Sequence, residues 1–207
     1  MHRRTALSVS AALLVAAPLL SACSGQPRPG TAAVVGGERI TTSALQAQVS
    51  DVRAAQNGSA RPAELIAGTP GLERAKLSVM LQSRILDRMA ATAGVTVSTK
   101  EIEEEHTKYA EGNGGPERFG ELLLEKAAVT PGQTDRYLRD RVLIAKLTTR
   151  YGNAGLAAPA AAAAKELRIE VNPRYGAWNA QEINLGAAKT PWILQRTQPG
   201  QEPPAGV

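Results

Sequence analysis

The sequence predicts a mainly α-helical domain, and three observations lead to this fold class. Aromatic residues make up only 3% of the chain and Phe119 is the sole phenylalanine, so a core must be built from Leu, Ile, Val, Ala and Met. Such a composition favours helices over a β-sandwich. Residues 71–93 have the apolar periodicity of a long central helix, and two later segments begin with the polar residues that start helices.

The N-terminal segment is predicted to be a signal peptide covering residues 1–22. His2, Arg3 and Arg4 precede an apolar run over residues 6–20. That run is about five residues short of the roughly twenty that a stable transmembrane helix needs, which favours a cleaved signal. Its end, Leu-Ser-Ala followed by Cys23, resembles the lipobox family of signals. The resemblance implies that Cys23 is acylated and becomes the first residue of the mature chain.

The cysteine count agrees with lipid attachment at Cys23. This is the only cysteine, so an exported chain has no partner for an internal disulfide, and lipidation explains the odd thiol. The alternative is an ordinary signal peptide cut elsewhere. The polar, Pro- and Gly-containing residues 23–31 then predict a flexible tether, which would hold the folded part at the extracytoplasmic face of the cell membrane.

The charge of the chain argues against nucleic acid as a partner. The sequence has 24 Lys and Arg residues against 19 Asp and Glu, a net charge of +5. Loss of Arg3 and Arg4 with the signal leaves 22 against 19. This mild excess, together with export, is not typical of a dedicated nucleic-acid binder.

The folded domain is predicted over residues 32–178, beginning with a small β element. Residues 33–35 can form a strand, Gly36 and Gly37 a tight turn, and residues 38–40 a returning strand. Thr41 and its neighbours offer N-caps for a helix that ends before Asn57.

The longest predicted helix follows a short interrupted segment. Residues 61–69 contain Pro62 and Gly68 and are expected to be irregular or only briefly helical. The helix over residues 72–93 has an apolar stripe and further apolar residues round much of its circumference, so we expect it to be central and covered by other helices, and Gly94 should end it. The stripe comprises Leu72, Ala75, Val79, Leu86, Met89 and Ala93, with Gln82 as its polar exception, and Leu77, Met80, Leu81 and Ile85 extend the apolar surface.

Three further helices are expected. Ser98 and Glu101 have the spacing of a capping box at the start of the first, which ends in the loop over residues 112–115. Pro116 suits the first turn of the second helix. The third starts with Thr130 as its cap and continues to Gly152.

The C-terminal part is expected to be less regular. The alanine-dominated residues 154–164 could be a linker or a short helix after Pro159, and we favour the linker. Residues 167–171 alternate as in a strand with one covered face. Residues 179–207 are Pro-rich and predicted to be a mostly disordered tail.

The chain from residue 32 to residue 178 resembles the N-terminal chaperone domain of SurA-type and PrsA-type extracytoplasmic folding factors. Three entry patterns of those domains have matches here, each a structural signature without chemistry of its own. The first is matched by Val35, Gly37, Ile40 and Thr41, the second by Val97, Ser98, Glu101 and Ile102, and the third by Arg139 or Arg141, Leu143, Ile144, Lys146 and Leu147.

The resemblance implies a SurA N-terminal-like helical domain with a small β element that joins its two ends. Residues 167–171 would pair with Val34 and Val35. Many relatives carry an inserted parvulin prolyl isomerase domain, but residues 152–165 are far fewer than the roughly 50 that a compact domain needs. We therefore expect no isomerase activity.

Residues that could carry chemistry are few. His106 shares a helical face with Ile102 and Tyr109, and we interpret it as a packing residue rather than a ligand or base. The acidic run 103–105, next to Glu101, is interpreted as a solvated face with a Glu104–Lys108 pair. Recognisable nucleotide-binding, zinc-protease and nucleophile motifs are missing from the sequence, so we expect no cofactor, metal or catalytic site.

Binding is therefore the predicted activity. Candidates for a client-binding surface are the aromatic residues Tyr109, Phe119, Tyr137, Tyr151 and Trp178, with Tyr175 and Trp192 also considered, although such residues belong to a core more often than to a binding groove. The sequence predicts a membrane-anchored, non-catalytic, chaperone-like lipoprotein that binds unfolded or newly exported polypeptides. The alternative is an adaptor that docks one cell-envelope partner.

Overall fold

The computed structural model describes residues 29–152 and 155–187. The predicted signal peptide, Cys23, most of the tether, Trp192 and most of the predicted tail lie outside the described residues. The helices are α1 (Thr42–Asn57), α2 (Pro62–Ala67), α3 (Leu72–Ala93), α4 (Thr99–Gly112), α5 (Pro116–Ala127), α6 (Thr134–Tyr151) and α7 (Ala157–Leu167), with a 3₁₀ turn at Pro131–Gln133. The strands are β1 (Thr31–Val35), β2 (Glu38–Thr41), β3 (Glu170–Val171), β4 (Ala177–Asn179) and β5 (Asn184–Gly186). The fold is therefore mainly helical, as predicted.

A three-stranded sheet joins the N-terminal strands to the segment that follows α7. Its order is β2-β1-β3 with antiparallel neighbours, and β1 pairs with β3 through Ala33 with Val171 and Val34 with Glu170. The Gly36 amide also donates to the Leu167 carbonyl. This confirms that the two segments pair, with two differences: the partners in β1 are Ala33 and Val34 and not Val34 and Val35, and the strand is shorter because Leu167 still belongs to α7.

Several predicted helix ends are confirmed, but the predicted Thr130 cap is wrong, because α6 begins at Thr134 and the Thr130 side chain makes no capping hydrogen bond. The Thr41 hydroxyl accepts the Ala44 amide at 3.0 Å. Ser98 and Glu101 form the complete capping box, in which each side chain accepts a backbone amide of the other residue. Gly94 ends α3 at a φ of 65°, a left-handed conformation that favours glycine. These signals act over a few residues, so the sequence alone specifies them.

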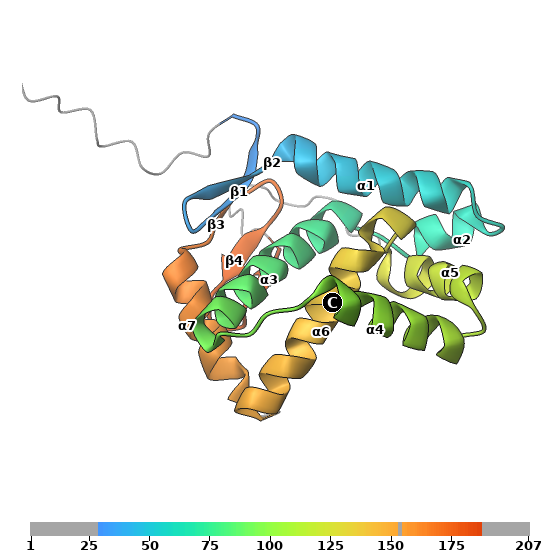
Figure 1. The fold of residues 1–207 in the computed structure, drawn as a ribbon. Coiled ribbons are helices and arrows are strands. Elements are labelled where there is room, and N and C mark those ends of the chain that lie inside the picture. The colour runs from blue at the N-terminus through green and yellow to red at the C-terminus, as the bar shows by residue number, and fades with distance from the viewer. Residues whose placement is uncertain (1–28, 153–154, 188–207) are drawn as a thin grey trace, which may run out of the picture.

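Helix α3 lies at the centre of the domain, and α1, α6 and α7 pack against it (Figure 1). Leu77 and Leu81, both fully buried, pack with the sheet and α1, and Ile85 and Met89 pack with α6 and α7. A third apolar cluster lies among α4, α5 and α6. The central position of α3 agrees with its broadly apolar sequence.

The face of α3 that is buried differs from the predicted stripe. Val79 has 51% of its surface exposed, and Ala75 and Gln82 are also exposed, whereas Leu77, Leu81 and Ile85 are buried. The helix has more apolar residues than one buried face requires, so periodicity alone did not select the face that packs.

Helix α2 is held by a polar network at the end of α1. The buried Gln56 amide donates to the Leu65 carbonyl and the Thr69 hydroxyl, and its oxygen accepts from Arg53 at 2.7 Å. Because every polar group of the Gln56 side chain has a partner, its burial is tolerated. Residues 61–69 are thus briefly helical, one of the two outcomes expected.

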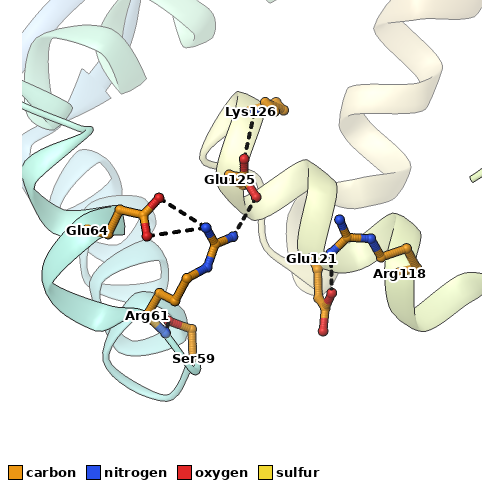
Figure 2. Close-up of polar contacts among 7 residues, drawn as sticks. All are labelled: Ser59, Arg61, Glu64, Arg118, Glu121, Glu125 and Lys126. Carbon is orange, nitrogen blue, oxygen red and sulfur yellow. Dashed lines mark hydrogen bonds and ion pairs between the residues drawn. The ribbon is translucent and has the colours of Figure 1, made fainter.

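A bridge between α2 and α5 fixes the end of the helical region away from the sheet. Arg61 contacts Glu64 of α2 at 3.0 Å and Glu125 of α5 at 2.8 Å, and Figure 2 shows its guanidinium between the two carboxylates. The pair Arg118–Glu121 lies within α5 and joins no other element. The pair of Arg61 with Glu125 thus connects the start of α2 to α5, although exposed ion pairs contribute little stability singly.

The predicted linker over residues 154–164 is wrong over most of its length. Residues 153 and 154 lie outside the described part, but residues 157–167 form α7. Alanine has the highest helix propensity, and Pro159 stands in the first turn, where its missing amide breaks no helical hydrogen bond. Ala163 and Ala164 are buried against α3, so their small side chains let the two helices approach closely.

The ordered domain also extends beyond the predicted boundary at residue 178. Strands β4 and β5 form an antiparallel hairpin, in which Trp178 pairs with Leu185. Leu185 joins the core beside Tyr175. Gly176, at a φ of 141°, allows this closure because a Cβ there would lie 2.3 Å from the Gly186 carbonyl oxygen. Residues 179–187 are therefore part of the fold and not of a tail.

Candidate functional site: an apolar groove

The predicted binding aromatics fall into two groups. In the first, the Tyr109 and Phe119 rings stack with centroids 5.7 Å apart and an angle of 11° between their planes. Arg141 of α6 lies over both the Tyr109 and Tyr137 rings, and its Nε donates to the Tyr109 hydroxyl at 2.9 Å. Phe119 is buried, while Tyr109 and Tyr137 are partly buried. The group joins α4, α5 and α6 as a packed cluster.

The second group lies against other elements. Tyr151 at the end of α6 and Trp178 in β4 are partly buried and pack against the cluster of Ile85, Met89 and Leu147. Trp178 also contacts the core that contains Tyr175, which is buried. The five predicted residues therefore do not form one surface, and their role in binding stays a prediction.

An apolar groove runs between α3, α6 and α7, and sequence reasoning missed it as a site. Its volume is about 300 Å³, at the lower end of the usual range for ligand sites. It is lined by Gln82, Ile85, Leu86, Met89, Ile144, Leu147, Leu156, Ala160 and Ile183. We call this feature the apolar groove.

Three distant parts of the chain supply the walls of the apolar groove. Leu86 and Met89 come from the C-terminal half of α3, Ile144 from α6 and Ala160 from α7. Ile183, just before β5, completes the lining, and Figure 1 shows α6 and α7 diverging on either side of α3. With residues 154–164 predicted as a linker, the sequence predicts no helix that could form this third wall of the groove.

The chemistry of the apolar groove is that of hydrophobic contact. Gln82 is the one polar side chain among its lining residues. Ile144 keeps 43% of its surface exposed, so part of the apolar lining faces solvent. Such a surface suits side chains of an apolar segment and offers no acid, base or nucleophile for catalysis.

The signal that could have found the groove is the excess of apolar residues on α3 and α6. Leu86 belongs to the stripe that was expected to be buried, yet it remains only partly covered. Ile144 lies within the third family-like entry pattern, next to the fully buried Leu143. A helix whose apolar surface exceeds what its neighbours cover leaves a face for another partner.

The polar residues that the sequence singles out take part in packing and in surface ion pairs. The His106 ring is partly buried and meets Phe119 edge-on at 5.7 Å, as expected of a packing residue. The predicted Glu104–Lys108 pair is wrong, because Glu104 contacts Lys100 at 3.6 Å and Lys108 contacts Glu105 at 3.5 Å. Within residues 29–152 and 155–187, no group of three His, Cys, Asp or Glu residues is placed to hold a metal ion.

Glu101 has a larger role than its capping box. Its carboxylate pairs with Lys146 of α6, whose ammonium also donates to the Thr96 carbonyl at 2.8 Å. The hydrogen bond from Lys146, followed by those from Ser98, lowers the pKa of Glu101 to about 2. Glu101 belongs to the second of the three entry patterns that resemble SurA-type domains, and Lys146 belongs to the third. The ion pair between them therefore joins these two parts of the chain.

Helix α3 also carries a buried cation. Lys76 is only 4% exposed, and its Nζ donates to the Gln133 side-chain oxygen at 2.7 Å. Burial lowers the pKa of Lys76 to about 8, against the opposing charge of Asp51 on α1. The ammonium thus connects α3 to the turn before α6.

The fold defines a helical domain whose N-terminal strands and the segment that follows α7 meet in one small sheet. A model of the family described as "SurA-like N-terminal domain" matches residues 3–148. The match covers well over half of the chain, which therefore belongs to this family of chaperone-type folding-factor domains. Comparison with curated proteins gave no match, and comparison with solved structures gave none either.

Proposed function

We propose that this protein is a membrane-anchored, extracytoplasmic, chaperone-like lipoprotein that binds unfolded or newly exported polypeptides without catalysis. The observation that carries the proposal is the apolar groove on a SurA-like domain: eight of its nine lining side chains are apolar. Unfolded polypeptides expose apolar side chains, which such a groove covers reversibly. The side-chain amide of Gln82 can form hydrogen bonds with the backbone of a bound segment.

The anchoring part of the proposal rests on sequence. The run before Cys23 has the length and flanking charges of an export signal, and the residues preceding Cys23 resemble a lipobox. Among the described residues, no helix has the length and apolar character to cross a membrane. Cys23 would then provide the attachment. Cells fed a clickable palmitate analogue should label the wild-type chain and not Cys23→Ser; equal labelling of both would contradict the proposal.

Suppression of aggregation tests the binding proposal. The chain from Ser24 to Val207 should slow the aggregation of several unrelated proteins, such as reduced insulin and chemically denatured citrate synthase. Ile144→Glu places a carboxylate in the apolar groove, at a side chain 43% exposed, and should weaken the effect about tenfold because an apolar contact is replaced by a charge.

The matched control is Val79→Glu. Val79 is also a large exposed aliphatic residue, on α3 itself, but it does not line the apolar groove. Full suppression by Ile144→Glu, or equal losses in both variants, would contradict binding in the groove. An absence of suppression with the recovery of one envelope protein in pull-downs would support the adaptor alternative instead. Turnover in a prolyl isomerase assay would overturn the non-catalytic part.

A further inference from the structure

The C-terminal segment of the chain contains a short apolar run, which follows Ile183, a residue that lines the apolar groove, by about ten positions in the sequence. Trp192, Ile193 and Leu194 are the only three consecutive large apolar residues between 188 and 207, where the other residues are mainly polar, Pro or Gly. Ile183 lines the groove, and the described chain continues through β5 to residue 187. The run thus begins five residues after the last described position.

The chain is long enough to bring this run to the groove. From Ile183 to residue 187 a strand spans about 13 Å, at roughly 3.3 Å per residue. The five residues from 187 to 192 span at most about 17 Å. Trp192 can therefore return as far as Ile183 and enter the groove from that side.

The size and chemistry of the groove suit the same run. Its volume of about 300 Å³ is larger than an indole ring, so a tryptophan side chain can enter it. Its lining is apolar apart from Gln82. A tryptophan followed by two aliphatic residues offers the kind of side chains that the proposed clients would offer.

We propose that residues 192–194 dock in the apolar groove of the same molecule and compete there with client polypeptides. The competition with clients rests on the proposed function, because it requires that clients bind in the groove. The docking of residues 192–194 does not require client binding. A short tether gives the segment an effective concentration on the order of 1 mM. A segment with a free dissociation constant near 0.1 mM would then lower the apparent client affinity about tenfold.

Tryptophan fluorescence tests the docking directly. In the chain from Ser24 to Val207 with Trp178→Phe, Trp192 is the only tryptophan. The emission of Trp192 should be blue-shifted and protected from quenching by acrylamide. Ile144→Glu should move the emission maximum to that of an exposed tryptophan, and Val79→Glu should leave the maximum unchanged. Circular dichroism of each variant checks that the helical fold is kept.

Three outcomes would overturn the docking. Solvent-exposed Trp192 emission in the unmodified groove would show that the segment is free. Protection that rises with protein concentration would assign it to the groove of a second copy. A blue shift that appears only after addition of phosphatidylglycerol vesicles would assign it to the membrane.

A competition experiment separates this inference from the proposed function. Fluorescein-labelled, reduced and carboxymethylated α-lactalbumin serves as an unfolded polypeptide. The variant with Trp192→Ser, Ile193→Ser and Leu194→Ser should bind it about tenfold more tightly than wild type. Equal affinities, with binding still lost in Ile144→Glu, would overturn the inference and leave the function standing. Protected Trp192 with no polypeptide binding by either chain would overturn the function and leave the docking standing.

Discussion

At the scale of single residues, the buried ammonium of Lys76 lowers the free energy of unfolding by an amount that depends on pH. Its ammonium has one neutral hydrogen-bond partner, Gln133, and faces Asp51 on α1. Burial disfavours the charged form, which is why the pKa falls to about 8. The sequence predicts that Lys76 lies in the long helix. It does not predict the burial of Lys76, because this burial depends on how α1 and the turn before α6 cover the side chain.

The free energy of unfolding should therefore rise with pH in a defined window. Because the folded pKa of Lys76 lies below its value of 10.5 in the unfolded chain, the unfolded state binds more protons between about pH 8 and 10.5. Relative to Lys76→Met, wild type should gain about 2 kcal/mol between pH 8 and 10. Urea unfolding at several pH values measures this.

Other groups titrate in the same range, so the comparison needs a control. Lys165 of α7 is exposed, and Lys165→Met should leave the slope of stability against pH unchanged. If wild type and Lys76→Met keep a constant difference from pH 7 to pH 10, the lowered pKa of Lys76 is contradicted.

At the scale of elements, the joint between α4 and α6 rests on Glu101 and Lys146. The sequence predicted the capping box, since its two residues are three positions apart. It did not predict the partner on α6, which is 45 positions away and is brought close only by packing. Arg139 of the same helix approaches Asp87 of α3 at 2.7 Å, so α6 has ionic contacts on both sides.

Acid should weaken the α4–α6 joint. The folded pKa of Glu101 is lowered, so its contribution to stability is complete above about pH 4.5, the value in the unfolded chain, and is lost as pH falls toward about 2. Glu101→Gln should be less stable than wild type at pH 7, and the difference should disappear near pH 2. Thermal unfolding followed by circular dichroism measures both.

Glu104→Gln is the matched control because Glu104 lies on the same helix and contacts Lys100 at 3.6 Å on an exposed face. It should change stability by less than about 0.5 kcal/mol at either pH. A Glu101→Gln effect that persists unchanged at pH 2 would show that the carboxylate charge is not its cause.

The errors at the element scale have a shared physical origin. The alanine-dominated composition and Pro159 favour a linker over residues 154–164, whereas alanine's helix propensity favours the helix that forms. Val79 was placed in the core because α3 is apolar over more of its surface than it buries. In both cases the decisive contacts, those of α7 with α3 and of α6 with α3, join distant parts of the chain.

At the scale of the whole molecule, local signals predicted most of the fold but not the apolar groove. Helix caps, glycine stops and the hairpin turn act over a few residues, and the pairing of β1 with β3 followed from the family resemblance. The groove needs Leu86, Ile144 and Ala160 in one place, which only the packed helices provide. The candidate aromatics divided between two clusters for the same reason.

Site-specific photocrosslinking in intact cells tests most directly whether unfolded polypeptides bind in the apolar groove. A photoreactive amino acid at position 144 of the full chain should yield crosslinks to many exported proteins of different sizes. The same probe at position 79, which is even more exposed and lies on α3 outside the groove, should yield few. Equal yields at both positions, no crosslinks at 144, or a single crosslinked partner there would contradict the account.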